Sequence, residues 1–188
     1  MRDPEFRFLP CLSADLQRFH RVLRGGTQTV SMWRLLPALL SPRFFPVFLY
    51  RLAYWLYSVH LSPLAKLVSL VNFVIFGIEI GIRCRIGPGL ILPHTQGTVI
   101  GATSIGADVT IFQGVTLGAR ELDIAYDPLA RPIIGNGVVL GAGAKILGGI
   151  MLGNRCRVGA NAVVLDSVPA DAVAVGVPAR IILPEQQL

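Results

Sequence analysis

Apolar residues recur every six positions through the second half of the chain. The series begins at Ile80, slips by one residue between Leu92 and Val99, stops after Leu117 and resumes at Ile134. Its members are Ile80, Ile86, Leu92, Val99, Ile105, Ile111, Leu117, Ile134, Leu140, Ile146, Leu152, Val158 and Val164. Neither the period of a helix nor the alternation of a strand produces a six-residue beat. A fixed short period predicts one small unit, a short strand followed by a tight turn, stacked many times.

Three such strands per coil make a prism, with each recurring apolar side chain directed to its axis. Glycine often follows that residue, as at Gly81 and Gly141, where a turn leaves little room for a Cβ atom. The position four residues after it is usually small or β-branched and includes Cys84 and Cys156. The three cysteines are too few and too widely spaced for a disulfide framework or a zinc site. We expect a mainly β prism over residues 79–170, with these two thiols buried inside it.

A helical region is expected to precede the prism, over residues 1–78. The patterns predict four helices, over residues 13–24, 30–40, 46–60 and 63–77. Ser13 can cap the first helix, and the Gly25-Gly26 pair can end it.

The basic charge of the chain belongs to this helical region. The formal net charge is +6, and residues 1–78 hold nine Lys or Arg against three acids, whereas the rest holds eight of each. The second half of the region is strongly apolar, but Arg51, Pro63 and Lys66 interrupt every window of the roughly 20 residues that span a bilayer. The helices should therefore lie either against other copies of the chain or on an anionic membrane surface. Both alternatives remain open.

Two segments depart from the repeat. Residues 119–132 interrupt it with charged residues and two prolines, so we expect a loop that projects from the prism. Loops on a rigid scaffold often carry function. Residues 171–188 follow the last repeat as a C-terminal tail.

His94 is the candidate catalytic residue of the prism. It is the only histidine there, and it lies where the period slips, an irregularity typical of active sites. Since three units make a coil, the unit beginning at Leu92 should stack on the unit beginning at Ile111. His94 and Gln113, each third in its unit, should then be neighbours on one face. The loop that leaves after Gly118 should converge on them.

Several motifs together resemble the serine acetyltransferase family. They are Leu92-Pro93-His94-Thr95-Gln96-Gly97, Gly114-Val115-Thr116-Leu117-Gly118, Gly141-Ala142-Gly143-Ala144-Lys145-Ile146 and Gly176-Val177-Pro178-Ala179-Arg180, with a weaker match at Tyr50-Arg51-Leu52-Ala53-Tyr54-Trp55-Leu56. The resemblance covers about residues 79–182 and looks closest to that family's relatives in polysaccharide gene clusters, the colanic-acid-type O-acetyltransferases. It implies a left-handed parallel β-helix, a homotrimer, and acetyl-CoA bound in the cleft between adjacent prisms.

The resemblance also implies roles for residues. The family's catalytic histidine falls on His94, and its partner carboxylate falls on Glu79, where serine acetyltransferases have Asp. An imidazole of near-neutral pKa can take the hydroxyl proton of the acceptor, while a carboxylate on the far ring nitrogen fixes the tautomer. Backbone N–H groups can hold the oxyanion. The implied oxyanion and CoA sites consist of Gly118, Ala119, Ala142, Gly143, Ala160 and Arg180.

Three positions depart from the family's serine-recognition elements. Pro93 stands where the family has Asp, Arg131 stands where it has a second histidine before a proline, and Gly25-Gly26 stands where it has Asp-Pro. These departures favour a saccharide acceptor, free or lipid-linked, with Gln113 and Arg131 on the acceptor side.

The main interpretation is therefore an acetyl-CoA-dependent O-acetyltransferase of exopolysaccharide or capsule biosynthesis, with His94 as general base. The alternative is a serine O-acetyltransferase of cysteine biosynthesis, and a non-catalytic β-helix scaffold is a third possibility. A zinc carbonic anhydrase needs several histidines, so we expect no metal. We also expect no nucleic-acid partner and a cytoplasmic enzyme that can contact the inner face of the cytoplasmic membrane.

Overall fold

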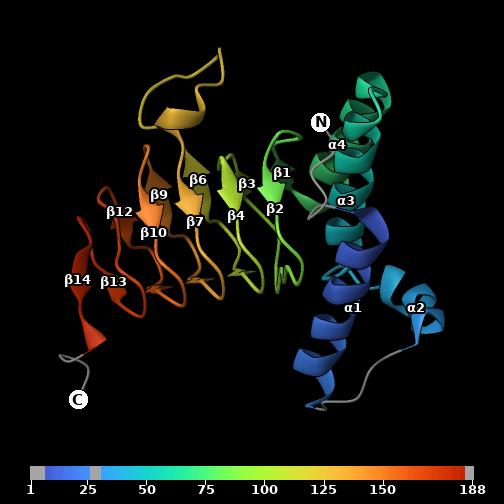
Figure 1. Ribbon diagram of the computed structural model, residues 1–188, viewed down its shortest axis with the longest axis horizontal. Coiled ribbons are helices and arrows are strands. Elements are labelled where there is room, and N and C mark those ends of the chain that lie inside the picture. The colour runs from blue at the N-terminus through green and yellow to red at the C-terminus, as the bar shows by residue number, and fades with distance from the viewer. Residues whose placement is uncertain (1–6, 26–30, 185–188) are drawn as a thin grey trace.

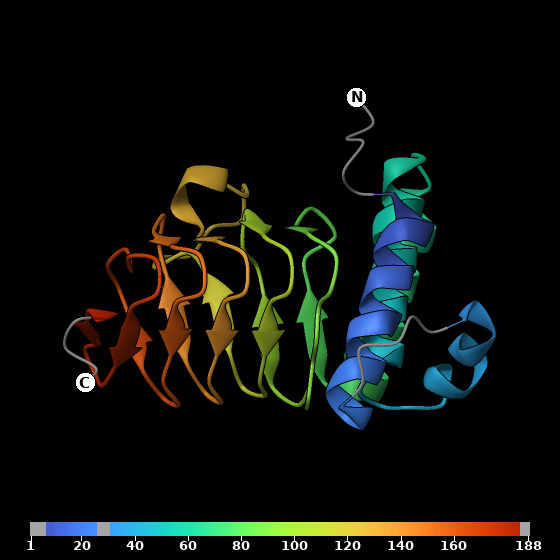
Figure 2. The same cartoon turned by 60° about the horizontal axis from the view of Figure 1, so that its bottom comes forward.

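The six-residue repeat folds into a three-sided prism. The computed structural model describes residues 7–25 and 31–184, and its strands form three sheets along the prism (Figures 1 and 2). In hydrogen-bonded order, sheet A consists of β1 (Ile78–Ile80), β3 (Thr98–Ile100), β6 (Thr116–Gly118), β9 (Lys145–Leu147) and β12 (Val163–Val164). Sheet B consists of β10 (Met151–Leu152), β7 (Ile133–Ile134), β4 (Ser104–Ile105) and β2 (Arg85–Ile86). Sheet C consists of β14 (Arg180–Ile182), β13 (Val173–Val175), β11 (Arg157–Val158), β8 (Val139–Leu140) and β5 (Thr110–Ile111).

The sheet registers fix which side chains face the prism axis. In sheet A, Ile80 pairs with Ile100, Ile100 with Leu117, and Leu117 with Ile146, all in parallel. These side chains are buried, as are the corresponding residues of sheets B and C. Burial of apolar area contributes about 25 cal/mol per Å² to the free energy of folding, so this axial column is the main stabilising element of the prism.

One residue of the predicted inward series is wrong. Val99 lies on the outer face of β3 with 36% of its surface exposed, and Ile100 takes the inward position. Ala102 is likewise buried in place of Thr103, the residue four positions after Val99 that the repeat pattern would direct inward. The slip after Leu92 is therefore longer than the sequence pattern indicates, and the extra length forms the turn that carries His94. Adjacent β-branched residues made the two registers indistinguishable in the sequence.

The glycine that follows many inward residues is required because successive coils approach closely. A Cβ atom on Gly141 would lie 2.7 Å from the backbone nitrogen of Ala160 in the next coil. The contact distance is that short because parallel strands are hydrogen-bonded directly to one another at this position.

Four α-helices form a layer across the first-coil end of the prism (Figures 1 and 2). They are α1 (Phe8–Arg24), α2 (Leu35–Leu39, preceded by a 3₁₀ turn at Met32–Arg34), α3 (Phe45–Ser58) and α4 (Ser62–Phe76). Helix α1 begins before the predicted start, so Ser13 lies inside it and accepts a hydrogen bond from Gln17 instead of capping it. Gly25 ends α1 in the left-handed conformation (φ 66°), whereas Gly26 lies outside the described residues.

A buried ion pair joins the helical layer to the prism. Arg51 of α3 and Asp15 of α1 are 4% and 0% exposed, and the Arg51 Nε atom lies 2.7 Å from Asp15 Oδ2. The other Asp15 oxygen accepts hydrogen bonds from the backbone N–H groups of Gly89 (2.7 Å) and Leu90 (2.8 Å) in the first coil. Arg51 also donates to two backbone carbonyls just before them. A buried charge is tolerated only when it is paired in this way.

A second polar contact holds the same coil. The Tyr50 hydroxyl donates to the carbonyl of Cys84 at 2.8 Å and accepts from the N–H of Ile86 at 3.2 Å. Desolvation raises the pKa of the Tyr50 phenol well above its ordinary value, so the hydroxyl stays protonated and can donate.

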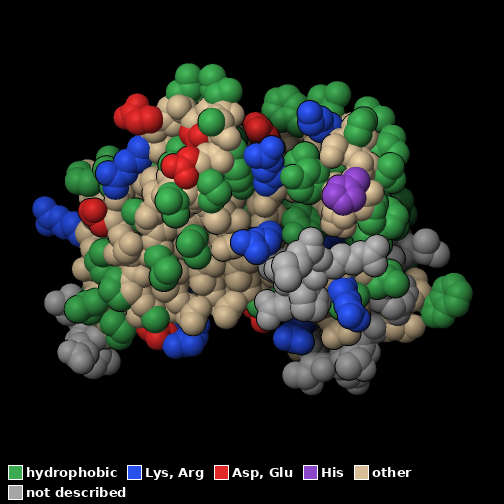
Figure 3. All heavy atoms as spheres, turned by 45° about the horizontal axis from the view of Figure 1, so that its top comes forward, with side chains coloured by type: hydrophobic (Ala, Val, Ile, Leu, Met, Phe, Trp, Pro, Cys, Tyr) green, Lys and Arg blue, Asp and Glu red, His purple; other side chains and the backbone are tan. Residues whose placement is uncertain are grey.

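The exterior of the helical layer is cationic and apolar. Within residues 7–25 and 31–77 the one acid is the buried Asp15, and the exposed cations are Arg7, Arg21, Arg24, Arg34, Arg43 and Lys66. Figure 3 shows hydrophobic side chains gathered with Lys and Arg over this layer, and Trp33 and Leu40 are 84% and 88% exposed. No helix within the described ranges is long and apolar enough to cross a bilayer. Contact of this exterior with other copies or with an anionic membrane surface stays a prediction.

The prism extends further toward the C-terminus than expected. Strand β13 falls in the predicted tail, yet it pairs in parallel with β11, and β14 then turns back antiparallel to β13. The antiparallel strand covers the last edge of sheet C.

We predict that Asp15→Asn destabilises the protein strongly, because it leaves the Arg51 guanidinium buried without a counter-charge. Breaking a buried pair costs about 3–5 kcal/mol. At about 3 °C per kcal/mol for a chain of this size, the melting temperature should fall by roughly 10 °C. Calorimetry against Asp166→Asn, which removes an exposed carboxylate, checks this. Equal melting of the two variants would refute the role of the pair.

Candidate active site

His94 lies on a turn at one edge of sheet A, which we call the C–A corner because its turns lead from sheet C to sheet A. The base of the His94 turn is tied to the residues just before β1. Thr95 Oγ1 donates to the carbonyl of Phe76 at 2.8 Å, and the N–H of Gly97 donates to the carbonyl of Gly77 at 2.9 Å. Thr95 is buried, whereas His94 is exposed. These hydrogen bonds fix the turn, which therefore presents the imidazole to solvent, where a substrate can reach it.

Glu79 is the outward residue of β1, and its register partner is Val99 in β3. It follows closely on Phe76 and Gly77, on which the His94 turn rests. Both side chains are exposed near the start of sheet A. Within the described part of the chain no hydrogen bond or ion pair joins them, so the catalytic dyad stays a prediction.

Gln113 lies in the next turn of the C–A corner. A bridge between Ile91 and Thr110 places the Leu92 and Ile111 units side by side, as the stacking argument predicts. The Oε1 atom of Gln113 is buried and has no hydrogen-bond partner among the described residues. An unsatisfied buried carbonyl costs free energy, so this oxygen is available to a donor supplied by a ligand or by another copy.

Small residues continue this corner along the prism. The N–H of Gly143 donates to the backbone carbonyl of Gln113, and the N–H of Asn161 donates to the backbone carbonyl of Ala142, both at 2.8 Å. Ala160 lies in the turn beyond. Arg180 is exposed at the start of β14, after a segment in which Ala179 bonds to Val163 of β12. The predicted CoA-side residues therefore follow the prism axis from its middle to its C-terminal end, except for the pair at Gly118.

The inserted loop lies at the opposite edge of sheet A, the A–B corner. Gly118 and Ala119 stand where β6 ends, and the loop projects from there (Figure 1). The predicted convergence of His94, Gln113 and the loop within one chain is wrong, because the length of the sheet A strands separates the two corners. The Leu92 and Ile111 units do lie in adjacent coils, but β6 runs from the corner of Gln113 to the corner from which the loop leaves.

A cavity of about 500 Å³ lies between the loop and the A–B corner. Its lining includes Ala119, Asp123 and Gly148. Arg120 reaches across the corner and donates to the carbonyls of Leu147 and Leu165. The backbone of Ala119 thus borders a space that an extended substrate arm can enter.

Arg131 holds the inserted loop in place. Its Nε atom lies 2.8 Å from Asp123 Oδ2, its Nη1 donates to the carbonyl of Gly101 at 3.0 Å, and its guanidinium lies 4.4 Å from the Tyr126 ring centroid. The guanidinium therefore has partners in its own chain, and the acceptor contact predicted for Arg131 has no independent support.

Asp123 is the anionic partner in this arrangement. A hydrogen bond from the backbone N–H of Asp127, assisted by Arg131, lowers the pKa of Asp123. Because the pKa in the folded state lies below the unfolded value, the stabilisation is complete at neutral pH. It is lost only as the pH falls through the lowered pKa.

The thiols of Cys84 and Cys156 are buried inside the prism. Burial raises the pKa of Cys84 to about 12 and that of Cys156 to about 11, so both stay protonated at neutral pH. Across residues 7–25 and 31–184 no group of His, Cys, Asp and Glu side chains is arranged to hold a metal ion.

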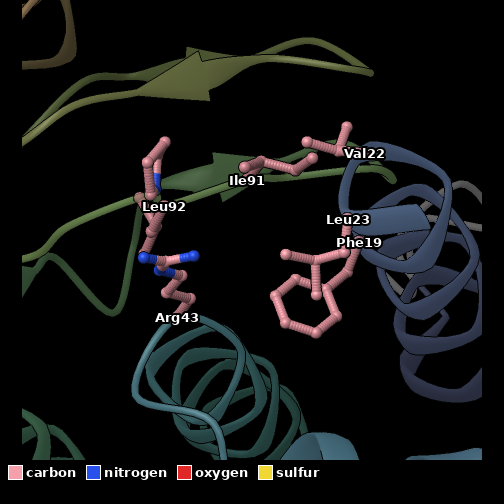
Figure 4. A pocket seen from close by; sticks show the side chains of 7 residues that line it. Phe19, Val22, Leu23, Arg43, Ile91 and Leu92 are labelled. Atoms are coloured by element: carbon pink, nitrogen blue, oxygen red, sulfur yellow. The ribbon is translucent and has the colours of Figure 1, made fainter. Parts of the chain in front are cut away.

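A small cavity that the sequence did not reveal lies beside the His94 turn. Its volume is about 80 Å³, and it is lined by Phe19, Val22, Leu23, Arg43, Ile91, Leu92 and Pro93. Figure 4 shows Arg43 reaching from the start of α3 toward Leu92, with Phe19 and Leu23 of α1 opposite. Nothing in the linear pattern brings these elements together, because α1 and α3 are far from Pro93 in sequence.

The chain is similar to proteins of a known family. Residues 131–166 match the family model "Bacterial transferase hexapeptide (six repeats)". The serine acetyltransferase of Helicobacter pylori strain J99 is 42% identical over 163 residues, which are 86% of this chain and 92% of the relative. The chain belongs to the serine acetyltransferase family. The serine acetyltransferase of Synechococcus elongatus is 41% identical over 75% of this chain, but the match spans only 57% of that longer relative.

Solved structures agree with this family membership. A serine acetyltransferase in complex with CoA superposes with a TM-score of 0.77 at 36% identity, over 93% of this chain and 69% of that one. The left-handed parallel β-helix with an N-terminal helical region is thereby confirmed, and so is the prediction of an acetyl-CoA-dependent acyltransferase.

The prediction of an exopolysaccharide O-acetyltransferase is wrong. The relatives at 37–42% identity are serine acetyltransferases, as is the structure with CoA, so the serine alternative is favoured. Two of the residues that suggested a sugar, Arg131 and Gly25, have structural explanations. Arg131 packs the loop, and Gly25 supplies the left-handed residue that ends α1.

We predict that Asp123→Asn loosens the inserted loop, since the amide cannot pair with the Arg131 guanidinium. Limited proteolysis with chymotrypsin should then cut the loop, at Leu122, Tyr126 or Leu129, several-fold faster than in the parent protein. Glu121→Gln, which alters an exposed carboxylate of the same loop, serves as the control. Indistinguishable cleavage of the two variants would argue against the role of the Asp123–Arg131 pair in holding the loop.

Proposed function

We propose that the protein transfers an acetyl group from acetyl-CoA to the hydroxyl of serine. The observation that carries the proposal is the exposed imidazole of His94, which is held on a fixed turn. The sequence of the chain is 42% identical to that of a serine acetyltransferase over nearly the whole of that relative. The buried side-chain oxygen of Gln113 and the cavity beside Pro93 lie next to the same turn and supply contacts for a small acceptor.

In this proposal His94 is the general base. Its ring nitrogen takes the hydroxyl proton as the serine oxygen attacks the thioester carbonyl, which forms a tetrahedral oxyanion. Collapse of this intermediate breaks the carbon–sulfur bond, and His94 returns the proton to the departing CoA thiolate. Glu79 accepts a hydrogen bond from the other ring nitrogen and stabilises the imidazolium. Backbone N–H groups at Gly118 and Ala119 hold the oxyanion.

The two halves of this mechanism require more than one chain. His94 stands at the C–A corner, where the strands of sheet A begin, with Glu79 on β1 nearby. Gly118 and Ala119 stand at the A–B corner, where β6 ends, so one chain cannot bring the two groups to the same substrate. We propose a homotrimer in which the A–B corner of one copy faces the C–A corner of the next, with CoA between them. The small residues Ala142, Gly143 and Ala160 then line the groove in which the pantetheine arm lies.

Release of CoA from acetyl-CoA tests the function. The parent protein should release CoA with serine, and much less with monosaccharides or oligosaccharides at the same concentration. His94→Ala should lower kcat about 100- to 10,000-fold, since it removes the general base. His60→Ala, a change in an exposed histidine of the helical layer, should leave the rate unchanged. No serine-dependent release by the parent protein would sink the proposal.

Light scattering tests the assembly. The active species should have three times the 20.3 kDa mass of one chain. Full activity in a fraction of monomer mass would contradict a site shared between copies.

A further inference from the structure

The cavity beside the His94 turn has one charged wall in an otherwise apolar lining. Six of its seven lining residues are apolar, and the seventh is Arg43, whose side chain extends into the space between α1 and the first coil (Figure 4). Arg43 is exposed on its other side, and the apolar lining shields the side that faces the cavity from water, which strengthens a charge-assisted hydrogen bond made there.

Arg43 differs from the two arginines that tie α1 and α3 to the prism. Arg51 is paired with Asp15, and Arg18 donates to Val109 and Thr110 and faces Asp108. The guanidinium of Arg43 has no carboxylate partner among the described residues.

The size of the cavity limits what it can hold. A cavity of about 80 Å³ has room for several water molecules. A carboxylate with the carbon atom that bears it therefore fits this space. Pro93, which lines the cavity, is bonded directly to His94, so a group held there is within a small molecule's length of the imidazole.

We propose that Arg43 binds the carboxylate of the acceptor and selects hydroxy acids with a free carboxylate over neutral analogues. This inference rests on the proposed serine acetyltransferase activity. A guanidinium matches the planar geometry of a carboxylate with two parallel N–H···O bonds. The α-carbon side of the acceptor then packs against Pro93 and Ile91, and its hydroxyl is directed toward His94.

Steady-state kinetics with serine and serinamide test the proposal. Serinamide keeps the hydroxyl and the amine but replaces the carboxylate by a neutral amide. The parent protein should prefer serine, and Arg43→Gln should raise KM for serine roughly 10- to 100-fold, the effect expected for one hydrogen-bonded charge. The variant should keep KM for acetyl-CoA and should use serinamide as well as the parent does. Arg43→Lys should recover part of the preference, since it restores the charge without the fork.

Arg34→Gln provides the matched control. Arg34 is an exposed arginine of the helical layer that does not line the cavity, so this variant should retain the parent's preference. Equal use of serine and serinamide by the parent protein would overturn the role of Arg43 while leaving the serine activity intact. An undiminished preference in Arg43→Gln would do the same. Failure of the parent to acetylate either compound would instead refute the proposed function itself.

Discussion

The column of apolar side chains along the prism axis is the constraint on which the rest of the molecule depends. Each coil contributes one inward residue per sheet, and the backbone of the next coil is hydrogen-bonded directly above it. Because this stacking permits no variation in the strands, every irregularity must be absorbed at a corner. The turn of His94 and the loop after Gly118 are the two places where the repeat lengthens, and both project away from the axis.

The helical layer depends on the prism in a different way. It is attached through the buried Asp15 and Arg51 side chains and the Tyr50 hydroxyl, which satisfy backbone groups that the first coil would otherwise leave unpaired. This attachment brings α1 and the start of α3 against Pro93. The same contacts that close the open end of the prism therefore create the small cavity beside His94. Stability and the shape of this cavity are therefore linked at the junction.

The candidate site residues are divided between the two edges of sheet A. The His94 imidazole and the buried side-chain oxygen of Gln113 belong to the C–A corner, whereas the inserted loop and its cavity belong to the A–B corner. Arg131 illustrates why the function was misjudged from the sequence. An arginine where a family motif has histidine suggests a changed substrate, yet its hydrogen bonds to Asp123 and Gly101 give it a structural task. A substitution in a motif shows only that a contact has changed, not which ligand replaced it.

The sequence by itself determined the prism, the loop insertion, the approximate helices and the identity of the candidate base. Each of these follows from local periodicity or from a motif, because a stacked repeat makes spatial neighbours out of residues at a fixed separation. The choice of Ile100 over Val99 as the inward residue was settled only by the sheet register, since neighbouring β-branched residues suit either face. Tertiary structure alone decided that the loop and His94 lie at opposite corners, and that Arg43 lines a cavity beside Pro93. These facts depend on strand direction and on the docking of helices distant in sequence, and no local pattern encodes either one.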